Sequence, residues 1–563
     1  MIRFRKSLRA LLFVLTTFCG LSGMAQTDPV AEAKQLFEQE RWPELANLMH
    51  QGQHNSADLN YYYGIALAHI ERWNEASKAL SDGQRLAPND KRFLIELAGV
   101  AFRQKKYGEA RRDLHRALQL DPKDAYAGEF LATLYFLAGN LDAALKYWNP
   151  AGKPEIAEVR IAPAFKVRPA ILDHAFAFAP ASKMTVEELL ASNARLSGLE
   201  IFSNFKINLT ARPDGRFDAT FRAQELNGFG NSKIQALVRT FSGIVFEEIT
   251  PEFYNLRGSG TNIISLFRFD PDKRRALLNM AGPLGGNPQW RYRLGADLRN
   301  ENWTVQTSFT GPSTVLGELN LRRESLSAEI SRFVGSRLGW STGVEVSHRD
   351  FRNVIAGVAL APGLLATGYQ VKQKTQVTYE LWRLPEKRLT ISTGASSQAG
   401  RIWSQPGQAF EKLQASLSVH WFPPDRGDDY ETQWRVRAGK TFGDLPFDEL
   451  FMLGVDRDND LPLRAHIGTR HGQKGSAPLG GNYFLSNWES DKHVYSNGIL
   501  TVKLGPFLDM GKILDSSSSV GPQKWLFDTG AQAKLRVLGV GVVLLYGKDL
   551  RSGNNAFYAN VGW

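Results

Sequence analysis

The chain contains a single cysteine, Cys19, in 563 residues. An internal disulfide needs two cysteines, so a disulfide framework is excluded. Cys19 also lies in an N-terminal segment that we expect to be cleaved, and the bulky Phe18 before it does not fit a lipoprotein cleavage site. The mature chain should therefore carry no thiol, which excludes cysteine-based chemistry as well.

Long apolar runs are also missing. Beyond the N-terminus no stretch reaches the roughly 18 continuous apolar residues that a membrane-crossing helix needs. Strands that close into a barrel satisfy their backbone groups without such a run. The sequence therefore has to be read for strands as well as for helices.

The excess of positive over negative charge is small. The formal net charge is +11, and it falls to about +7 if the four cations of the first nine residues are removed. Such diffuse basicity does not indicate nucleic-acid binding. The ten histidines show no metal-ligand spacing, and we predict neither a metal ion nor a cofactor.

Residues 1–25 have the pattern of a secretory signal peptide. Four cations precede an apolar run from Ala10 to Leu21, and the segment closes with a small-x-Ala pattern at Gly23-Met24-Ala25. A membrane anchor is the alternative, but the run is shorter than the roughly 20 residues of a spanning helix. We expect export and cleavage after Ala25.

A helical repeat follows in residues 26–150. Pro88 and Pro122 are 34 residues apart, as are Trp73 and Tyr107, and this is the period of the tetratricopeptide repeat. Small residues recur at the same spacing, where two helices have to pack closely: Gly64, Ala98, Ala132, Ala76, Ala110 and Ala144. Such arrays bind extended segments or other proteins; the alternative is that the repeat is only a spacer.

Residues 151–228 read as a small α/β unit. EIAEVRIA predicts a strand, about two helices follow, and two further strands meet at the turn Pro213-Asp214-Gly215. Phe205, Ile207 and Leu209 alternate with polar residues, so one face of the hairpin should be buried. The order strand, helix, helix, strand, strand resembles a POTRA domain, a periplasmic module that precedes certain outer-membrane barrels.

From residue 229 to 563 apolar and polar residues alternate, with a period of two residues. Alternating segments such as Trp290 to Leu298 and Leu413 to Trp421 have an apolar face and an often cationic polar face. A soluble sandwich would alternate too, but the export signal and the aromatic C-terminus favour a transmembrane antiparallel β-barrel. Phe557, Val561 and Trp563 share the outer face of the last strand. At about 20 residues per strand and connection we expect about sixteen strands.

One strand carries an acidic residue on its inner face. In LTVKLGPFLDMGKI, Phe507 and Asp509 alternate with the apolar set Leu504, Leu508 and Met510. A carboxylate in a narrow lumen gains most from a bidentate guanidinium. A long loop folded into the barrel could supply one from Arg464, which lies in LPLRAHIGTRHG.

These motifs resemble the BamA, TamA and FhaC superfamily of outer-membrane barrels. In that family an inner-loop motif, Val-Arg-Gly-aromatic, meets a strand motif, Phe-x-Asp-x-Gly. Phe507, Asp509 and Gly511 match the strand motif, and Glu489 falls where the family often has a second carboxylate. The loop motif is matched by Arg464 and its apolar neighbour Leu463.

Three departures from the family pattern leave the identity of this chain's client polypeptides undetermined. Ala465 and His466 replace the glycine and the aromatic of the loop motif, so loop docking should differ in detail. The POTRA-like unit is single. A tetratricopeptide array stands where further POTRA domains usually stand.

The resemblance implies insertion or translocation of polypeptides at the outer membrane. Residues 26–228 would lie in the periplasm, the barrel would contact outer-membrane lipid, and client polypeptides and periplasmic or lipoprotein partners would bind the array. A seam between a first strand at about Lys233 to Phe241 and the last at about Ala556 to Trp563 would open. The alternatives are an exopolysaccharide export pore, which also combines such arrays with barrels, and a structural or adhesive protein.

An enzyme is not expected. Gly339-Trp340-Ser341-Thr342-Gly343 matches the hydrolase pattern G-x-S-x-G. A nucleophile elbow needs a helix directly afterwards, and the following VEVSHRDF alternates like a strand.

Overall fold

The computed structural model describes residues 29–50, 56–228, 246–306, 315–356, 360, 362–404, 407–423, 429–497, 500–515, 524–537 and 540–561, with the single positions 237, 241, 243 and 244. The chain divides into two compact units, Met1–Leu134 and Tyr135–Trp563. The expected signal peptide, residues 1–25, lies outside the described residues. Among those described, no helix is long and apolar enough to cross a membrane.

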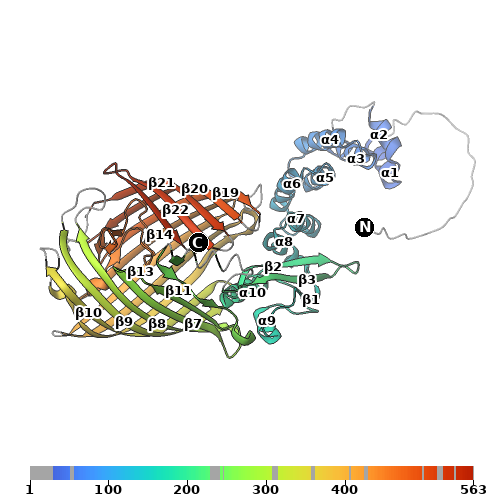
Figure 1. Ribbon diagram of the computed structural model, residues 1–563. Helices are drawn as coiled ribbons and strands as arrows, with labels where there is room; N and C mark the ends of the chain where they lie inside the picture. The colour runs from blue at the N-terminus through green and yellow to red at the C-terminus, as the bar shows by residue number, and fades with distance from the viewer. Residues whose placement is uncertain are drawn as a thin grey trace, which may run out of the picture. The chain divides into compact units, whose positions relative to one another are not determined.

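The first unit is a stack of helix pairs (Figure 1). Its helices are α1 (Pro29–Glu38), α2 (Trp42–His50), α3 (Ala57–His69), α4 (Trp73–Leu86), α5 (Lys91–Arg103), α6 (Tyr107–Leu120) and the first part of α7 (Ala125–Leu137). The recurring small residues lie where helices touch: a Cβ at Gly64 would meet Leu80 at 2.5 Å, and Ala98 and Ala110 are fully buried. Pro88 and Pro122 follow the ends of α4 and α6, as expected, because proline cannot continue a helix.

The second unit begins with the rest of α7 and helix α8 (Leu141–Trp148), followed by the α/β unit. Its elements are β1 (Ile156–Ala162), α9 (Pro169–Ala175), α10 (Val186–Leu199), β2 (Phe202–Ala211) and β3 (Phe217–Glu225). This is the predicted order, with β3 in the middle of the sheet, parallel to β1 and antiparallel to β2. Ile207, Leu209 and Phe221 are buried, so the hairpin face assigned from the sequence is the inner one.

The remainder of the chain is a closed barrel. Its main wall strands are β6 (Asn262–Arg268), β7 (Lys273–Leu284), β8 (Asn287–Gln306), β9 (Val315–Val334), β10 (Leu338–Ala356), β11 (Gly368–Leu384), β12 (Leu389–Trp403), β13 (Gln408–Trp421), β14 (Tyr430–Gly443), β19 (Tyr483–Ser496), β20 (Leu500–Ile513), β21 (Leu526–Val537), β22 (Val540–Asp549) and β23 (Asn555–Val561). Each pairs antiparallel with its neighbour in sequence, and β14 pairs directly with β19. The short strands β4 (Glu248–Ile249) and β5 (Glu252–Phe253) pair with β6.

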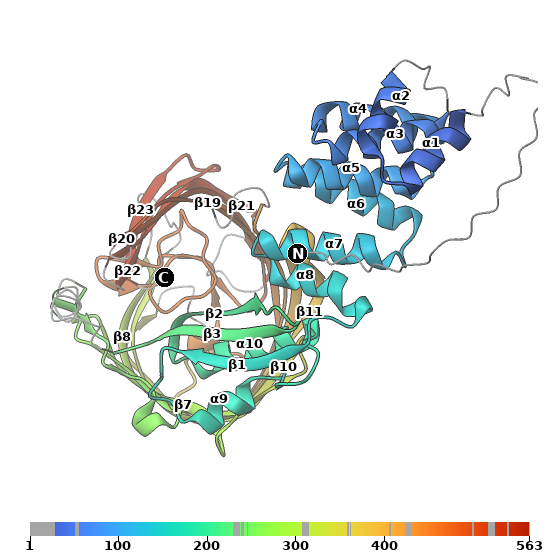
Figure 2. The same ribbon diagram turned by 90° about the vertical axis from the view of Figure 1, so that its right-hand side faces the viewer.

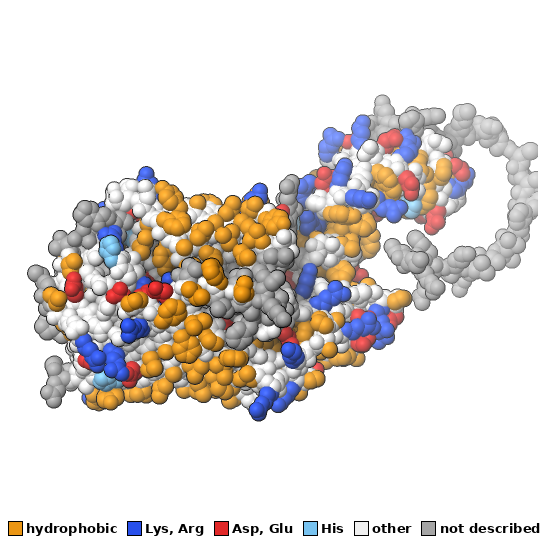
Figure 3. Space-filling view, viewed as in Figure 1, with side chains coloured by type: hydrophobic (Ala, Val, Ile, Leu, Met, Phe, Trp, Pro, Cys, Tyr) orange, Lys and Arg blue, Asp and Glu red, His pale blue; other side chains and the backbone are white. Residues whose placement is uncertain are grey.

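The wall has an apolar outside and a polar inside. On β20, Leu504 and Leu508 are 45% and 47% exposed, whereas Phe507 and Asp509 are 1% and 0% exposed. The space-filling view shows apolar side chains covering much of the visible outer face of the barrel (Figure 3). The two faces predicted for this strand are therefore confirmed.

The segment between β14 and β19, residues 444–482, leaves the wall and is called the inner loop here. It contains the short helix η6 (Phe447–Glu449) and the short strands β15 (Phe451–Met452), β16 (Thr469–Arg470), β17 (Gln473–Lys474) and β18 (Leu479–Gly480). β17 pairs at Lys474 with Trp303 on β8. Leu453, Leu461 and Leu463 pack against wall side chains of β19, β20 and β21. In the view along the barrel, chain fills part of the ring formed by the wall strands (Figure 2).

Two expectations about the ends of the barrel concern segments that the structure describes only in part. Most of the expected first strand, Lys233 to Phe241, lies outside them, and the two described positions, Leu237 and Phe241, are helical rather than extended. The total of about sixteen strands that the sequence predicts counted this first strand. At the other end Phe557 is 64% exposed on the outer face as expected, while Trp563 and the side chain of Val561 are not described.

The G-x-S-x-G match lies within β10. Ser341 pairs with Ser331 on β9 and with Gln376 on β11, so it sits in continuous sheet. A nucleophile elbow needs a sharp turn from strand to helix, and this segment has none. The match is a chance feature of an alternating strand.

Candidate functional site: the inner loop and its wall partners

Arg464 of the inner loop contacts Asp509 of β20 in a bidentate arrangement. Arg464 Nη2 lies 2.7 Å from Asp509 Oδ1, and Arg464 Nε donates to Asp509 Oδ2 at 2.9 Å. The backbone N–H of Arg464 also donates to Oδ2 at 2.9 Å. The side chains are 5% and 0% exposed. The contact expected from the two sequence motifs is therefore present, with the carboxylate held by side chain and backbone together.

The remaining nitrogen of the guanidinium reaches two other wall strands. Arg464 Nη1 lies 2.6 Å from Glu489 Oε2 on β19 and donates to Gln532 Oε1 on β21 at 3.0 Å. The ring of Phe507 lies against the guanidinium, 4.1 Å from its carbon to the ring centroid. The sequence left the direction of Glu489 open, and the structure turns it into the lumen.

Asn487, which sequence reasoning missed, connects the loop to the same carboxylate. Its Nδ2 donates to Asp509 Oδ1 and to the backbone carbonyl of Pro462, both at 2.8 Å. It lies opposite Asp509 in the β19–β20 register. It lies two residues from Glu489 on the same strand, whose direction the sequence left open, so nothing in the sequence placed Asn487 in the lumen or linked it to the loop.

The other members of the loop motif also touch the wall. Leu463 is fully buried, and a Cβ on Gly511 would come within 3.3 Å of its side chain. The backbone N–H of Ala465 donates to Asp528 Oδ2 on β21 at 2.6 Å, and His466 Nδ1 lies 3.0 Å from the same oxygen. The departures from the family motif thus bring a histidine–aspartate contact to a position where the family has an aromatic residue.

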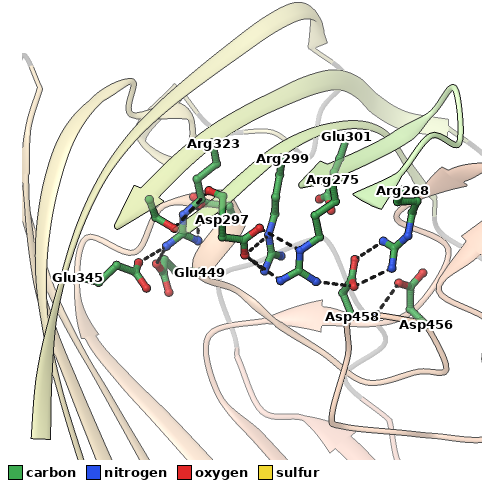
Figure 4. A network of polar contacts seen from close by, with 12 residues as sticks. Arg268, Arg275, Asp297, Arg299, Glu301, Arg323, Glu345, Glu449, Asp456 and Asp458 are labelled. Atoms are coloured by element: carbon green, nitrogen blue, oxygen red, sulfur yellow. Dashed lines mark hydrogen bonds and ion pairs between the residues drawn. The ribbon is translucent and has the colours of Figure 1, made fainter. Parts of the chain in front are cut away.

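A second cluster holds the loop on the opposite side of the lumen. Asp458 accepts from Arg268 at 2.7 Å and from Arg275 at 2.7 Å. Lys474 Nζ lies 3.3 Å from Asp458 and 2.7 Å from Glu301 on β8. Figure 4 shows Arg275 reaching Asp458 on one side and Asp297 on the other.

A third cluster surrounds helix η6. Glu449 lies 2.7 Å from Lys372 on β11 and 3.2 Å from Lys412 on β13. Arg349 on β10 lies 2.6 Å from Asp448 and is fully buried. Figure 4 shows Arg323 beside both Glu345 and Glu449 at this end of the network. Cations of the wall thus meet acids of the loop, the reverse of the Arg464 cluster.

These two clusters were not predicted, although part of their pattern was visible. The sequence showed cationic inner faces on several strands, and the loop carries its acids in FDEL and VDRD. Which acid meets which cation depends on the path of the loop through the lumen. That path has no local sequence pattern.

The α/β unit lies against the β8 and β9 side of the barrel. Glu200 at the end of α10 lies 3.2 Å from Arg291 and 3.3 Å from Arg293. Asn262 Nδ2 on β6 donates to the carbonyl of Leu199 at 2.9 Å and is 1% exposed. These contacts put the unit against the start of β6 and the start of β8, at one mouth of the barrel.

Comparisons with known proteins found one family profile and several similar solved structures. Residues 101–152 match the family profile "Tetratricopeptide repeat". The chain is similar to BamA from Haemophilus ducreyi lacking POTRA domains 1–3, at 11% identity over 73% of this chain and 85% of that one, with a TM-score of 0.39. It is similar to CdiB from Escherichia coli, at 12% identity over 73% and 76%, with a TM-score of 0.47.

A third similar structure covers a smaller share of the chain. YrrB, described as a tetratricopeptide protein with an unusual peptide-binding site, is 21% identical over 23% of this chain and 67% of its own, with a TM-score of 0.21. No curated protein sequence matches the chain. The proposals below therefore rest on the geometry of the chain itself.

Proposed function

We propose that this chain is an outer-membrane protein that inserts or translocates polypeptides. The observation that carries the proposal is the Arg464–Asp509 pair: a loop folded into a closed barrel and fixed there by a buried bidentate contact. This is the arrangement that the loop and strand motifs imply by their resemblance to the insertase and translocase superfamily. The helical array and the α/β unit, residues 26–228, would lie in the periplasm and receive clients.

The barrel closure has a feature that suits such a role. In barrel order the last strand, β23, is followed by β4 and β5. Among the described residues, β23 spans seven and β4 and β5 span two each, against 20 in β8 and β9. A short junction has few backbone hydrogen bonds to break, and a client strand that pairs with the freed edge need not face lipid unsatisfied.

The array suits the capture of unfolded clients. Stacked helical pairs present an extended surface on which a chain segment binds without having to fold. Partners in the periplasm or lipoproteins could bind the same surface. This part of the proposal is supported by the repeat itself and by the match of residues 101–152.

The test is reconstitution of the purified full-length chain in liposomes. We expect it to bind an unfolded outer-membrane protein and to bring it into a protease-protected, membrane-inserted form or across the bilayer. Arg464→Ala should reduce this activity while the barrel still assembles. Passage of an acidic polysaccharide, with no polypeptide bound or inserted, would contradict the proposal and favour the export pore.

A further inference from the structure

The outer face of the barrel has a hollow on β6, β7 and β8. It measures about 340 Å³, and apolar side chains line it at Phe267, Phe269, Ala276 and Leu298. Phe267, Ala276 and Leu298 lie opposite one another in the strand register. The two large side chains are 48% and 50% exposed, and the small Ala276 lies between them. The hollow therefore opens outward from the wall, on the side that faces lipid in a membrane barrel.

The outer face changes from apolar to polar at this hollow. One register position toward the start of β8, the outward residues of β7, β8 and β9 are Leu278, Ala296 and Leu326. One position the other way they are Arg274, Asn300 and Arg322. The α/β unit contacts the start of β6 and of β8, so the polar side lies away from it. In the space-filling view the apolar band gives way to charged and polar side chains at that end (Figure 3). The hollow thus lies at the edge of the apolar band, where headgroups meet acyl chains.

Arg274 supplies an uncompensated positive charge at this edge. It is exposed, and among the described residues it has no ion pair and no side-chain hydrogen bond. Arg322, the other outward cation of the lining, already lies 2.5 Å from Glu324. The outward side chains of the lining therefore leave one net positive charge, and it belongs to Arg274.

Asn300 adds a hydrogen-bond donor beside this charge. It is directly opposite Arg274 in the β7–β8 register. Its Oδ1 accepts from Asn320 at 2.7 Å, while its Nδ2 has no acceptor in the part of the chain that the structure describes. A guanidinium and an amide N–H side by side suit the oxygens of a phosphate group, which only accept when ionised.

The dimensions and surroundings of the hollow select a lipid as its occupant. Phe267 and Leu298 lie on strands two spacings apart, roughly 10 Å, and their own side chains fill part of that distance. An alkyl chain fits between them, but a helix, about 10 Å across, does not. An extended peptide would leave its backbone groups unpaired on a face that contacts lipid. An alkyl chain has no such groups.

We propose that this hollow binds a lipid with a phosphate headgroup. The phosphate would contact Arg274 and Asn300, and an acyl chain would lie over Ala276. The lipid would come from the leaflet away from the α/β unit. Because the short closure strands β4 and β5 pair with β6, the lipid would lie next to the barrel closure. The proposal requires only that the outer wall faces a bilayer, and it does not depend on polypeptide transport.

The test is native mass spectrometry of the delipidated full-length chain with phosphatidylglycerol in a neutral detergent. We expect one phosphatidylglycerol to be retained in preference to phosphatidylcholine, because the choline cation offsets the phosphate. Arg274→Gln should weaken retention about fivefold, the contribution of one arginine at an anionic lipid surface. Arg274→Lys keeps the charge and should retain most of the binding. Ala276→Trp should fill the hollow and weaken retention as well.

Two controls separate this site from general binding of lipid or anion. Arg401→Gln removes another exposed arginine from the outer face, near the end of β12, and should retain phosphatidylglycerol like the unchanged chain. Glycerol phosphate, which has no acyl chain, should not compete. Equal retention of the two lipids, equal losses in Arg274→Gln and Arg401→Gln, or full competition by glycerol phosphate would each overturn the proposal.

A measurement on the unchanged chain covers the case in which Ala276→Trp does not assemble. Phosphatidylglycerol with a photoreactive group in its acyl chain should label the wall around Ala276 more strongly than the wall around Arg401. Uniform labelling would show an ordinary lipid shell and contradict a specific site. A chain that retains the lipid here and moves no polypeptide would contradict the transport proposal alone.

Discussion

Arg464 and Asp509 are joined by three hydrogen bonds of 2.9 Å or less, one of them from the backbone of Arg464. Because the backbone takes part, the contact fixes the path of the loop as well as the position of one side chain. The carboxylate is fully buried on the wall. The pair therefore couples the inner loop directly to the barrel wall.

Arg464→Ala should loosen the inner loop and impair function while leaving barrel assembly possible. Removing one partner of a buried ion pair costs about 3 to 5 kcal/mol, since the other charge is left uncompensated. Asp509→Asn should give a similar defect. The double variant should be no worse than the poorer single one, because residues that share a contact are not additive. Thermal unfolding of the barrel measures the coupling.

The control for this cycle is Arg322→Ala, which removes an arginine whose contact with Glu324 is about half exposed. It should change stability by less than about 1 kcal/mol. Strict additivity of the Arg464 and Asp509 changes would show that the two residues do not act together.

Asp458→Asn should release the opposite side of the inner loop. It removes the charge that Arg268, Arg275 and Lys474 share, and Arg268 is 2% exposed at this contact. Cations left uncompensated in the lumen favour a state in which water reaches them. We expect a higher ion conductance of the barrel in planar bilayers. Asp460→Asn, an exposed aspartate of the same loop, is the control; equal conductance in the two variants would contradict the prediction.

Residues 26–228 and the barrel turns at the same end as the α/β unit should face the periplasm. Because the mature chain is expected to have no cysteine, single cysteines report position cleanly. Lys387→Cys, in the turn after β11, should react with an impermeant maleimide only after the outer membrane is opened. Arg551→Cys, in the turn after β22, should react in intact cells. Protease added to intact cells should leave the segment from Tyr61 to Pro150 uncut, and its digestion from outside would reverse the topology.

The sequence alone predicted those structural features that follow from a local pattern of residues. The 34-residue period located the helix pairs, and alternation gave the inner and outer faces of β20, because both follow from backbone periodicity. The Arg464–Asp509 contact needed the family resemblance, which supplied the docking of a distant loop. The clusters around Asp458 and Glu449 could not be foreseen. They depend on strand register and on the path of the loop, neither of which a single sequence encodes locally.

Glu96→Gln should stabilise the helical array at neutral pH. Burial raises the pKa of the Glu96 carboxyl, and a hydrogen bond from Tyr61 only partly opposes this. A raised folded-state pKa means that the folded array binds the proton more tightly than the unfolded chain. Stability is therefore greatest below the unfolded pKa of about 4.3 and declines as the pH rises through the folded pKa. The helical circular dichroism signal of the full chain should melt at lower temperature at neutral pH than near pH 4. Glu96→Gln should remove that difference, whereas Glu109→Gln, at an exposed position on α6, should leave it unchanged; an undiminished pH dependence in Glu96→Gln would assign the effect to another group.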